Sequence, residues 1–165
     1  MIIRKATYLK HRDIAIHEAS HFAVGTLLKL PMQLPEVFRD GSGGIAPFDR
    51  EEAHRLGVIA APYDPPEQEA KAMGKAGVRI AAVFLAGCAG EAIHFGVPTD
   101  IIIGGRTPDM MYAGLVLELA GQPISQLSAA WEIAVRLLRH AWPAVVRTAE
   151  LIPVTGGTYR PPRFN

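Results

Sequence analysis

The chain has little of several features that define common protein classes. Cys88 is the only cysteine among 165 residues, so neither an intrachain disulfide nor a cluster of thiolate zinc ligands can form. Lys and Arg number 17 against 16 Asp and Glu, and this balance gives no reason to expect a nucleic-acid or anionic-membrane partner. These absences favour a globular protein in a reducing compartment, and we expect it in the cytoplasm.

Long apolar segments and phosphate-binding loops are also missing. The basic N-terminal segment MIIRKATYLK is not followed by an apolar stretch of signal-peptide length. The uncharged apolar run of residues 80–90 is far below the roughly 20 residues that a membrane-spanning helix needs. Gly74-Lys75 lacks the other residues of a P-loop, which excludes ATP binding by that route. We therefore expect no membrane contact.

The most informative segment that is present is HEASH, residues 17–21, which has the pattern H-E-x-x-H. In residues 14–28 the only formal charge is Glu18, as in a buried helix. Histidines four apart share a helix face, and both imidazoles can bind one ion at about 2.0–2.1 Å. The pattern therefore predicts Zn²⁺ bound by His17 and His21, with Glu18 as the base that activates a water.

An ordinary pair of core histidines, bonded to backbone carbonyls, is the alternative to this metal site. Burying two imidazoles and a carboxylate costs several kcal/mol unless partners satisfy them, and one metal ion would satisfy all three. A catalytic zinc also takes a third protein ligand, which spacing alone does not identify. The candidates are the remaining acids and histidines in plausible contexts: Glu91, Asp100, Asp109, Glu118, His11, His54, His94 and His140.

The spacing of apolar residues, together with the Gly and Pro residues that end helices, predicts mainly helical elements. A first helix begins between Thr7 and Asp13 and ends near Lys29, and a second runs from about Pro66 to Gly96. Residues 31–66 suit short strands or an edge hairpin, near 45–48 and 58–60, or else an irregular surface loop.

Two further helices are predicted in the C-terminal half. Thr107-Pro108-Asp109 suits a helix start, and the helix to about Ala120 presents Met111, Leu115 and Leu119 as core-filling residues. The last helical stretch, Ser128–Leu151, is expected to be kinked or divided at Pro143. Residues 1–152 are then one domain, and 153–165 a flexible tail.

Three segments together resemble the peptidase domain of FtsH-type ATP-dependent zinc proteases. They are AIHEASHFAV, FLAGCAGEAIHFG and GGRTPDMMYAGLVLELA, in that order, covering roughly residues 10–120. The resemblance implies a mainly α (α+β), zincin-like peptidase domain with a small β element near the active site. It makes His17 and His21 zinc ligands, Glu18 the catalytic base and Asp109 the third ligand. Glu91 matches an acidic position that could orient a liganding imidazole or could only close a contact between packed helices.

Several residues depart from the family's pattern. Ser20 replaces a glycine, Cys88 an arginine, and Pro108 an asparagine. The family's ATPase module and membrane anchor have no counterpart in the sequence, so we expect the domain to stand alone. Peptide deformylases share H-E-x-x-H, but their cysteine ligand precedes the motif, whereas Cys88 follows it.

The resemblance implies a zinc-dependent endopeptidase that cleaves unfolded proteins or peptides by zinc-activated water, with Glu18 as general base. An extended substrate would pair with an edge strand, for which residues 42–60 are the candidate. A separate ATPase is a possible partner, and assembly into a homo-oligomer is open. The alternative function is a catalytically weak or inactive interaction module that keeps the peptidase fold.

Overall fold

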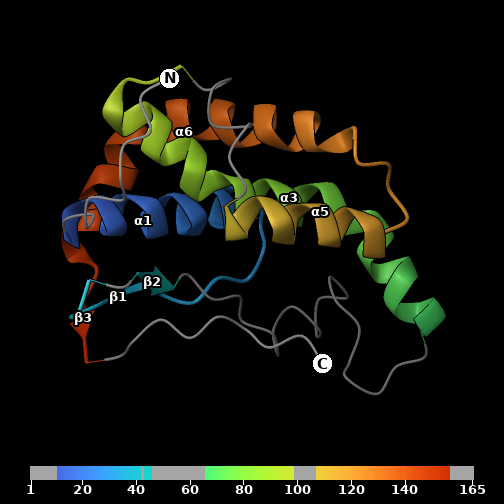
Figure 1. Ribbon diagram of the computed structural model, residues 1–165, viewed down its shortest axis with the longest axis horizontal. Coiled ribbons are helices and arrows are strands. Elements are labelled where there is room, and N and C mark those ends of the chain that lie inside the picture. Colours follow the sequence, from blue (N-terminus) through green and yellow to red (C-terminus); the bar gives the residue numbers. More distant parts are fainter. Residues whose placement is uncertain (1–10, 42, 46–65, 99–106, 157–165) are drawn as a thin grey trace.

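Four helices and three short strands make up the residues that the computed structural model describes, which are 11–41, 43–45, 66–98 and 107–156 (Figure 1). The helices are α1 (His11–Leu27), α3 (Pro66–Phe95), α5 (Pro108–Leu119) and α6 (Gln126–Leu151). The strands are β1 (Glu36–Phe38), β2 (Gly44–Ile45) and β3 (Val154–Thr155). The predicted class, mainly helical with a small β element, is confirmed.

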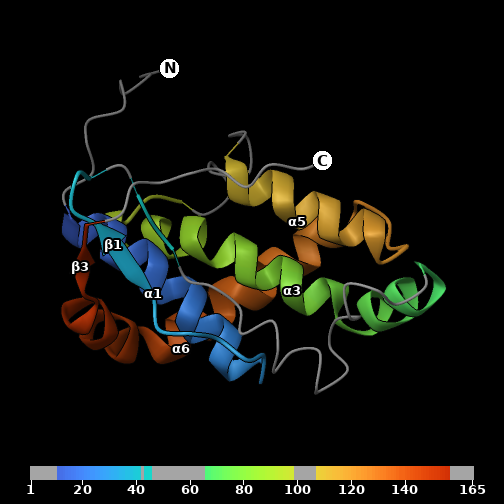
Figure 2. The same ribbon diagram turned by 90° about the horizontal axis from the view of Figure 1, so that it is seen from below.

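The helix α3 is the centre of the fold, because α1, α5 and α6 all pack against it (Figure 2). Its Ala76–Phe95 segment is long and apolar enough to cross a membrane by length and composition, but 72% of that window is buried inside the protein. The side chains of Ala81, Ala82, Ala86 and Ala89 are fully buried, and their small size lets neighbouring helices approach closely. The segment is therefore a core helix here.

The sheet lies against α1, and β1 is its central strand (Figure 1). β2 pairs with β1 antiparallel, with Val37 opposite Gly44. β3 pairs with β1 in parallel, with Val37 opposite Val154. The prediction of strands within residues 31–66 is confirmed for Gly44 and Ile45, whereas residues 46–65 lie outside the described part of the chain.

The prediction that the flexible tail begins at residue 153 is wrong for Val154 and Thr155, which form β3. The backbone N–H groups of Val37 and Arg39 donate to the carbonyl oxygens of Pro153 and Thr155, at 3.0 and 2.8 Å. These hydrogen bonds satisfy the backbone carbonyl groups of Pro153 and Thr155, which would otherwise have to bond to water. Residues 157–165 are outside the described part of the chain.

The predicted start of α5 is confirmed, because Thr107 is its N-cap and accepts a hydrogen bond from the Met110 backbone N–H. The prediction that Met111, Leu115 and Leu119 fill the core is wrong. These side chains are 66%, 37% and 51% exposed. Ala113 and Leu117 are the buried residues of α5 instead. Both sets have a spacing of four, so periodicity alone could not choose the buried face.

The helix α6 is continuous across Pro143 and starts at Gln126, so of the two predicted outcomes at Pro143, a kink or a division into two helices, the division did not occur. α1 and α3 lie within the predicted limits, since α1 ends at Leu27 and α3 spans Pro66–Phe95. The two are neighbours in the core, and the residues of the H-E-x-x-H motif lie where they meet.

Candidate metal centre

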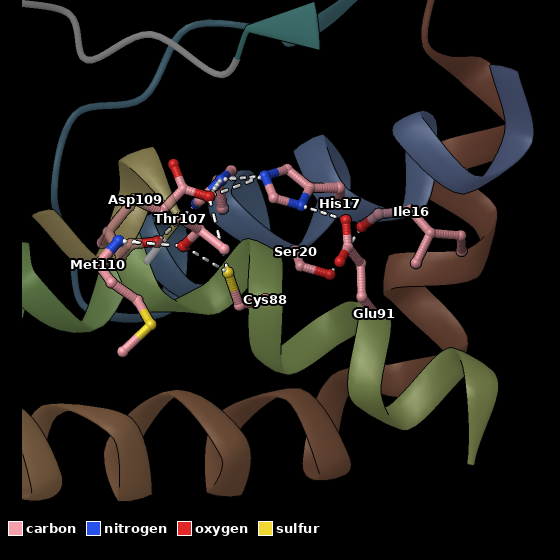
Figure 3. Close-up of polar contacts among 10 residues, drawn as sticks. Ile16, His17, Ser20, Cys88, Glu91, Thr107, Asp109 and Met110 are labelled. Atoms are coloured by element: carbon pink, nitrogen blue, oxygen red, sulfur yellow. Dashed lines mark hydrogen bonds and ion pairs between the residues drawn. The ribbon is translucent and has the colours of Figure 1, made fainter. Parts of the chain in front are cut away.

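The three predicted metal ligands lie together where α1, α3 and the first turn of α5 meet (Figure 3). The Nε2 atoms of His17 and His21 are 3.0 Å apart. The Asp109 Oδ2 atom is 3.1 Å from the first and 3.7 Å from the second. Asp109 follows His17 by 92 positions and His21 by 88 in the sequence, yet all three residues present a donor atom to one point.

These separations are those of ligands around one small cation. Three atoms each about 2.1 Å from a tetrahedral zinc ion lie about 3.4 Å from one another. The three observed distances, 3.0, 3.1 and 3.7 Å, lie on both sides of that value. Two imidazoles and a carboxylate are also a donor set that catalytic zinc takes. The residues present therefore fit a zinc ion without rearrangement of the backbone.

The outer nitrogens of both imidazoles are held by oxygen acceptors. The Nδ1 of His17 is 2.8 Å from Glu91 Oε1, and the Nδ1 of His21 is 2.6 Å from the Val83 carbonyl oxygen. A carboxylate or carbonyl oxygen can only accept, so each Nδ1 carries the proton and donates. In the neutral tautomer, each Nε2 then presents a lone pair to the centre, as a metal ligand must.

Without a metal, this arrangement needs a proton. Two Nε2 lone pairs facing each other beside a carboxylate repel, and one shared positive charge relieves the repulsion. Burial lowers the pKa of His17, but its hydrogen bonds with Asp109 and Glu91 outweigh burial and raise it well above the usual value. Burial and the neighbouring His17 charge lower the pKa of His21. Between their Nε2 atoms the two imidazoles thus hold one additional proton, which a divalent cation can replace.

The Asp109 carboxylate is ionised in this setting. Burial raises its pKa, but the hydrogen bond from His17 and the positive charge that His21 and His17 share outweigh burial and lower it. Its negative charge is therefore available to a cation at neutral pH.

Glu18 lies next to this cluster and is only 7% exposed. Burial, together with the negative charges of Asp109 and Glu91, raises its pKa to about 7, while the charge of His17 opposes the shift. The strand β2 lies directly against it: a Cβ atom added to Gly44 would be 2.6 Å from Glu18 Cγ. The base predicted from the sequence thus lies against the backbone of β2, an edge strand among the described residues, and within electrostatic reach of His17 and Asp109.

The backbone of α3 at Gly87 also lies directly against the cluster. A Cβ atom there would lie no more than 2.5 Å from the Nε2 atoms of both His17 and His21. Gly90, one turn further along, has the same role beside Ser20, whose hydroxyl donates to the Ile16 carbonyl oxygen at 2.7 Å. Glycine at position 87 therefore leaves the volume that an ion and its ligands occupy.

Cys88 and Thr107 also lie at the site, although the sequence did not assign them to it. The Cys88 sulfur is 3.4 Å from Thr107 Oγ1 and 3.9 Å from Asp109 Oδ2. Burial raises the pKa of the Cys88 thiol to about 11 despite the hydrogen bond with Thr107, so the group is a neutral thiol. In the sequence, the only indication that these two residues belong to the site is their position. Cys88 directly follows Gly87, and Thr107 directly precedes the helix that carries Asp109.

Most other candidates for the third ligand lie elsewhere or have other partners. His94 pairs with Asp13 at 3.2 Å, and His11 is bonded to the Arg39 carbonyl oxygen at 3.0 Å. Glu118 and His140 are exposed. Glu91 orients His17, as considered from the sequence. Asp100 and His54 are outside the described residues.

Comparison with family models, with curated proteins and with solved structures gave no match. The geometry of the side chains is therefore the observation on which a function can be based.

Proposed function

We propose that this protein is a zinc-dependent endopeptidase that hydrolyses peptide bonds of unfolded proteins or peptides. One observation carries the proposal: the Nε2 atoms of His17 and His21 and the Asp109 Oδ2 atom converge at distances of 3.0–3.7 Å. The position of Glu18 beside them favours hydrolysis over a purely structural metal site. The resemblance of three segments to FtsH-type peptidases gives independent support.

Each ligand has a defined part in this proposal. His17, His21 and Asp109 hold the ion, and Glu91 and the Val83 carbonyl oxygen fix the two imidazole rings. When bound, zinc supplies a water whose pKa is near about 7 and polarises the scissile carbonyl.

Glu18 carries out the proton transfers. Its carboxylate accepts the proton of the attacking water and then donates it to the leaving amine. Burial disfavours the ionised form of Glu18 in the metal-free protein, and a nearby divalent cation favours that form. Metal binding would therefore prepare the base as well as the water.

The strand β2 is the candidate docking edge for the substrate. Among the described residues, β2 pairs only with β1, and Gly44 lies against Glu18. An extended peptide added to this edge would have its backbone near the base. The proposed substrates are unfolded proteins or peptides, and a separate ATPase is a partner that could deliver folded proteins.

Metal analysis and proteolysis test the proposal together. Purified protein is expected to contain about one zinc per chain, measured element by element because the same donors can bind Fe²⁺. It should hydrolyse fluorescently labelled casein, and a chelator should abolish this activity. Glu18→Gln should retain zinc and lose at least about 99% of turnover, since general-base catalysis contributes about 10²-fold or more.

The control variant is Glu118→Gln, which changes an exposed carboxylate on α5 and should leave both readouts unaltered. Equal turnover by Glu18→Gln and the unmodified protein would contradict the role of Glu18. Absence of bound metal after loading with Zn²⁺ would contradict the whole proposal.

An interaction module that binds zinc without turnover is the second candidate. The exposed apolar side chains of Met111, Leu115 and Leu119 on α5 favour it, because such a stripe suits contact with another surface. Stoichiometric zinc with no hydrolysis of casein or of short peptides would decide for this candidate.

A further inference from the structure

The third ligand differs from the other two in how it is held. His17 and His21 lie in the middle of α1, and each ring has a strong acceptor on its outer nitrogen. Asp109 lies in the first turn of α5, directly after Pro108. A carboxylate there can rotate about two side-chain bonds unless something else fixes it. The contacts around Asp109 show what does so.

Three contacts connect the Asp109 carboxylate to α3 and to the start of α5 (Figure 3). The backbone N–H of Met110 donates to Thr107 Oγ1 at 3.3 Å. The Thr107 hydroxyl is 3.4 Å from the Cys88 sulfur, which is in turn 3.9 Å from Asp109 Oδ2. Cys88 is only 2% exposed, so water does not compete for its thiol.

The chemistry of the groups fixes the direction of this chain. An ionised carboxylate only accepts, so the thiol proton of Cys88 must point to Asp109 Oδ2. The thiol has no second proton, so the contact with Thr107 forms only if the Thr107 hydroxyl donates to sulfur. Thr107 Oγ1 uses a lone pair for the Met110 N–H and its proton for Cys88. Every donor and acceptor then has one consistent assignment.

We propose that Cys88 and Thr107 are positioning residues of the metal centre: Thr107 orients the Cys88 thiol, and the thiol holds the Asp109 carboxylate in its metal-binding orientation. The inference depends on the proposed function, since it assumes that Asp109 binds a metal. It assigns a role to Cys88, which replaces the arginine of the family that the sequence resembles. Neither residue touches the ion or the substrate.

Zinc affinity measured against a chromophoric chelator tests the role of Cys88. Cys88→Ala should weaken zinc binding about tenfold, the low end for loss of an outer hydrogen bond to a ligand. Cys88→Ser keeps a donor at the same place and should recover most of that loss. The absorption spectrum of the Co²⁺-substituted protein should change in Cys88→Ala, because the ligand geometry changes, and should be close to that of the unmodified protein in Cys88→Ser.

Thr107 is tested by a pair of variants. Thr107→Val removes the hydroxyl at nearly constant shape, and Thr107→Ser keeps it. Because Thr107 acts through Cys88, the two losses of zinc affinity should not add. The double variant Cys88→Ala/Thr107→Val should have about the zinc affinity of whichever single variant binds zinc less tightly. Loss of the N-cap also destabilises α5, so urea unfolding of each metal-free variant is measured in parallel.

Val145→Ala is the matched control, since it creates a cavity at a buried residue of α6, a helix that supplies none of the three ligands. It should lower stability and leave zinc affinity and the Co²⁺ spectrum unchanged. Equal zinc affinity of Cys88→Ala and the unmodified protein would overturn the inference, as would a loss in Cys88→Ser as large as that in Cys88→Ala. If the unmodified protein binds no metal, the proposed function itself fails, so the two failures are distinguishable.

Discussion

Glu18 is a carboxyl group whose ionised form opposes folding in the metal-free protein. Burial raises its pKa from 4.5 to about 7, so between these values the folded chain holds a proton that the unfolded chain has released. The folded state therefore loses stability as the pH rises from 4.5 through 7. Zinc beside the carboxylate would offset this loss.

A stability profile against pH measures this effect. We expect metal-free Glu18→Gln to be more stable than the unmodified chain at about pH 8, by up to about 3 kcal/mol. This difference in stability should decrease as the pH is lowered from about 7 and should be small below about pH 5. Urea unfolding at a series of pH values, in the presence of a chelator, gives the comparison. A difference that stays constant from acid to base would show that Glu18 ionises as freely in the folded chain as in the unfolded one.

Gly87 should be irreplaceable for metal binding. A methyl group there would occupy the space between α3 and the Nε2 atoms of His17 and His21, so Gly87→Ala is expected to abolish stoichiometric zinc binding. Gly114→Ala on α5 is the control, because among the described residues its Cβ would meet only Ile124 Cδ1, at 3.5 Å. That variant should bind zinc normally and gain about 0.5–1 kcal/mol from the helix preference of alanine. Full zinc occupancy in Gly87→Ala would contradict the geometry.

The residues that could be predicted from the sequence are those whose relation is local. His17, Glu18 and His21 belong to one helix, so their spacing alone places them together. Asp109 was selected through resemblance to a family, since no spacing rule connects it to α1. Cys88 and Thr107 were missed because their role depends on how α3 and α5 pack, which a single sequence does not encode in any short pattern.

Among the elements, β3 has a consequence for stability that a flexible tail would not have. A chain that ends at Ile152 loses the carbonyl acceptors of the Val37 and Arg39 N–H groups. We expect this truncation to destabilise the protein by about 1–3 kcal/mol, because a buried donor is left unsatisfied. A chain that ends at Gly156 keeps β3 and should match the full chain in urea unfolding. Equal stability of both truncated chains would contradict this role of β3.

Element boundaries were predictable where side-chain chemistry marks them. Thr107 at the N-cap and Pro108 at the first helical position predict the start of α5, and the helix begins there. The buried face of α5 was not predictable, because apolar residues occupy more than one of its faces. β1 lies within the 31–66 region where short strands were predicted, but not at either of the runs named there, and β3 was not predicted. They are three and two residues long and pair across more than 100 positions, so no local periodicity identifies them.

At the scale of the whole molecule, the proposed ion would connect two helices that reach each other mainly through α3. α1 supplies two ligands and α5 the third, and each packs against α3. Zinc at about 1,000 times its dissociation constant should stabilise the folded chain by about 4 kcal/mol. Hydrogen exchange measured with and without zinc should show the largest added protection in α5, which has few other partners. Protection confined to α6 would contradict this link.

The regular spacing on α3 ties these parts together. Val83, Gly87 and Glu91 follow one another at four-residue steps and meet His17 and His21, which have the same step on α1. Inserting one residue between Val83 and Glu91 would turn one half of this set by about 100° relative to the other half. The two rows therefore depend on their common spacing. Substitutions on the solvent-facing sides of α1 and α3 should be tolerated far more easily than an insertion or deletion that changes this spacing.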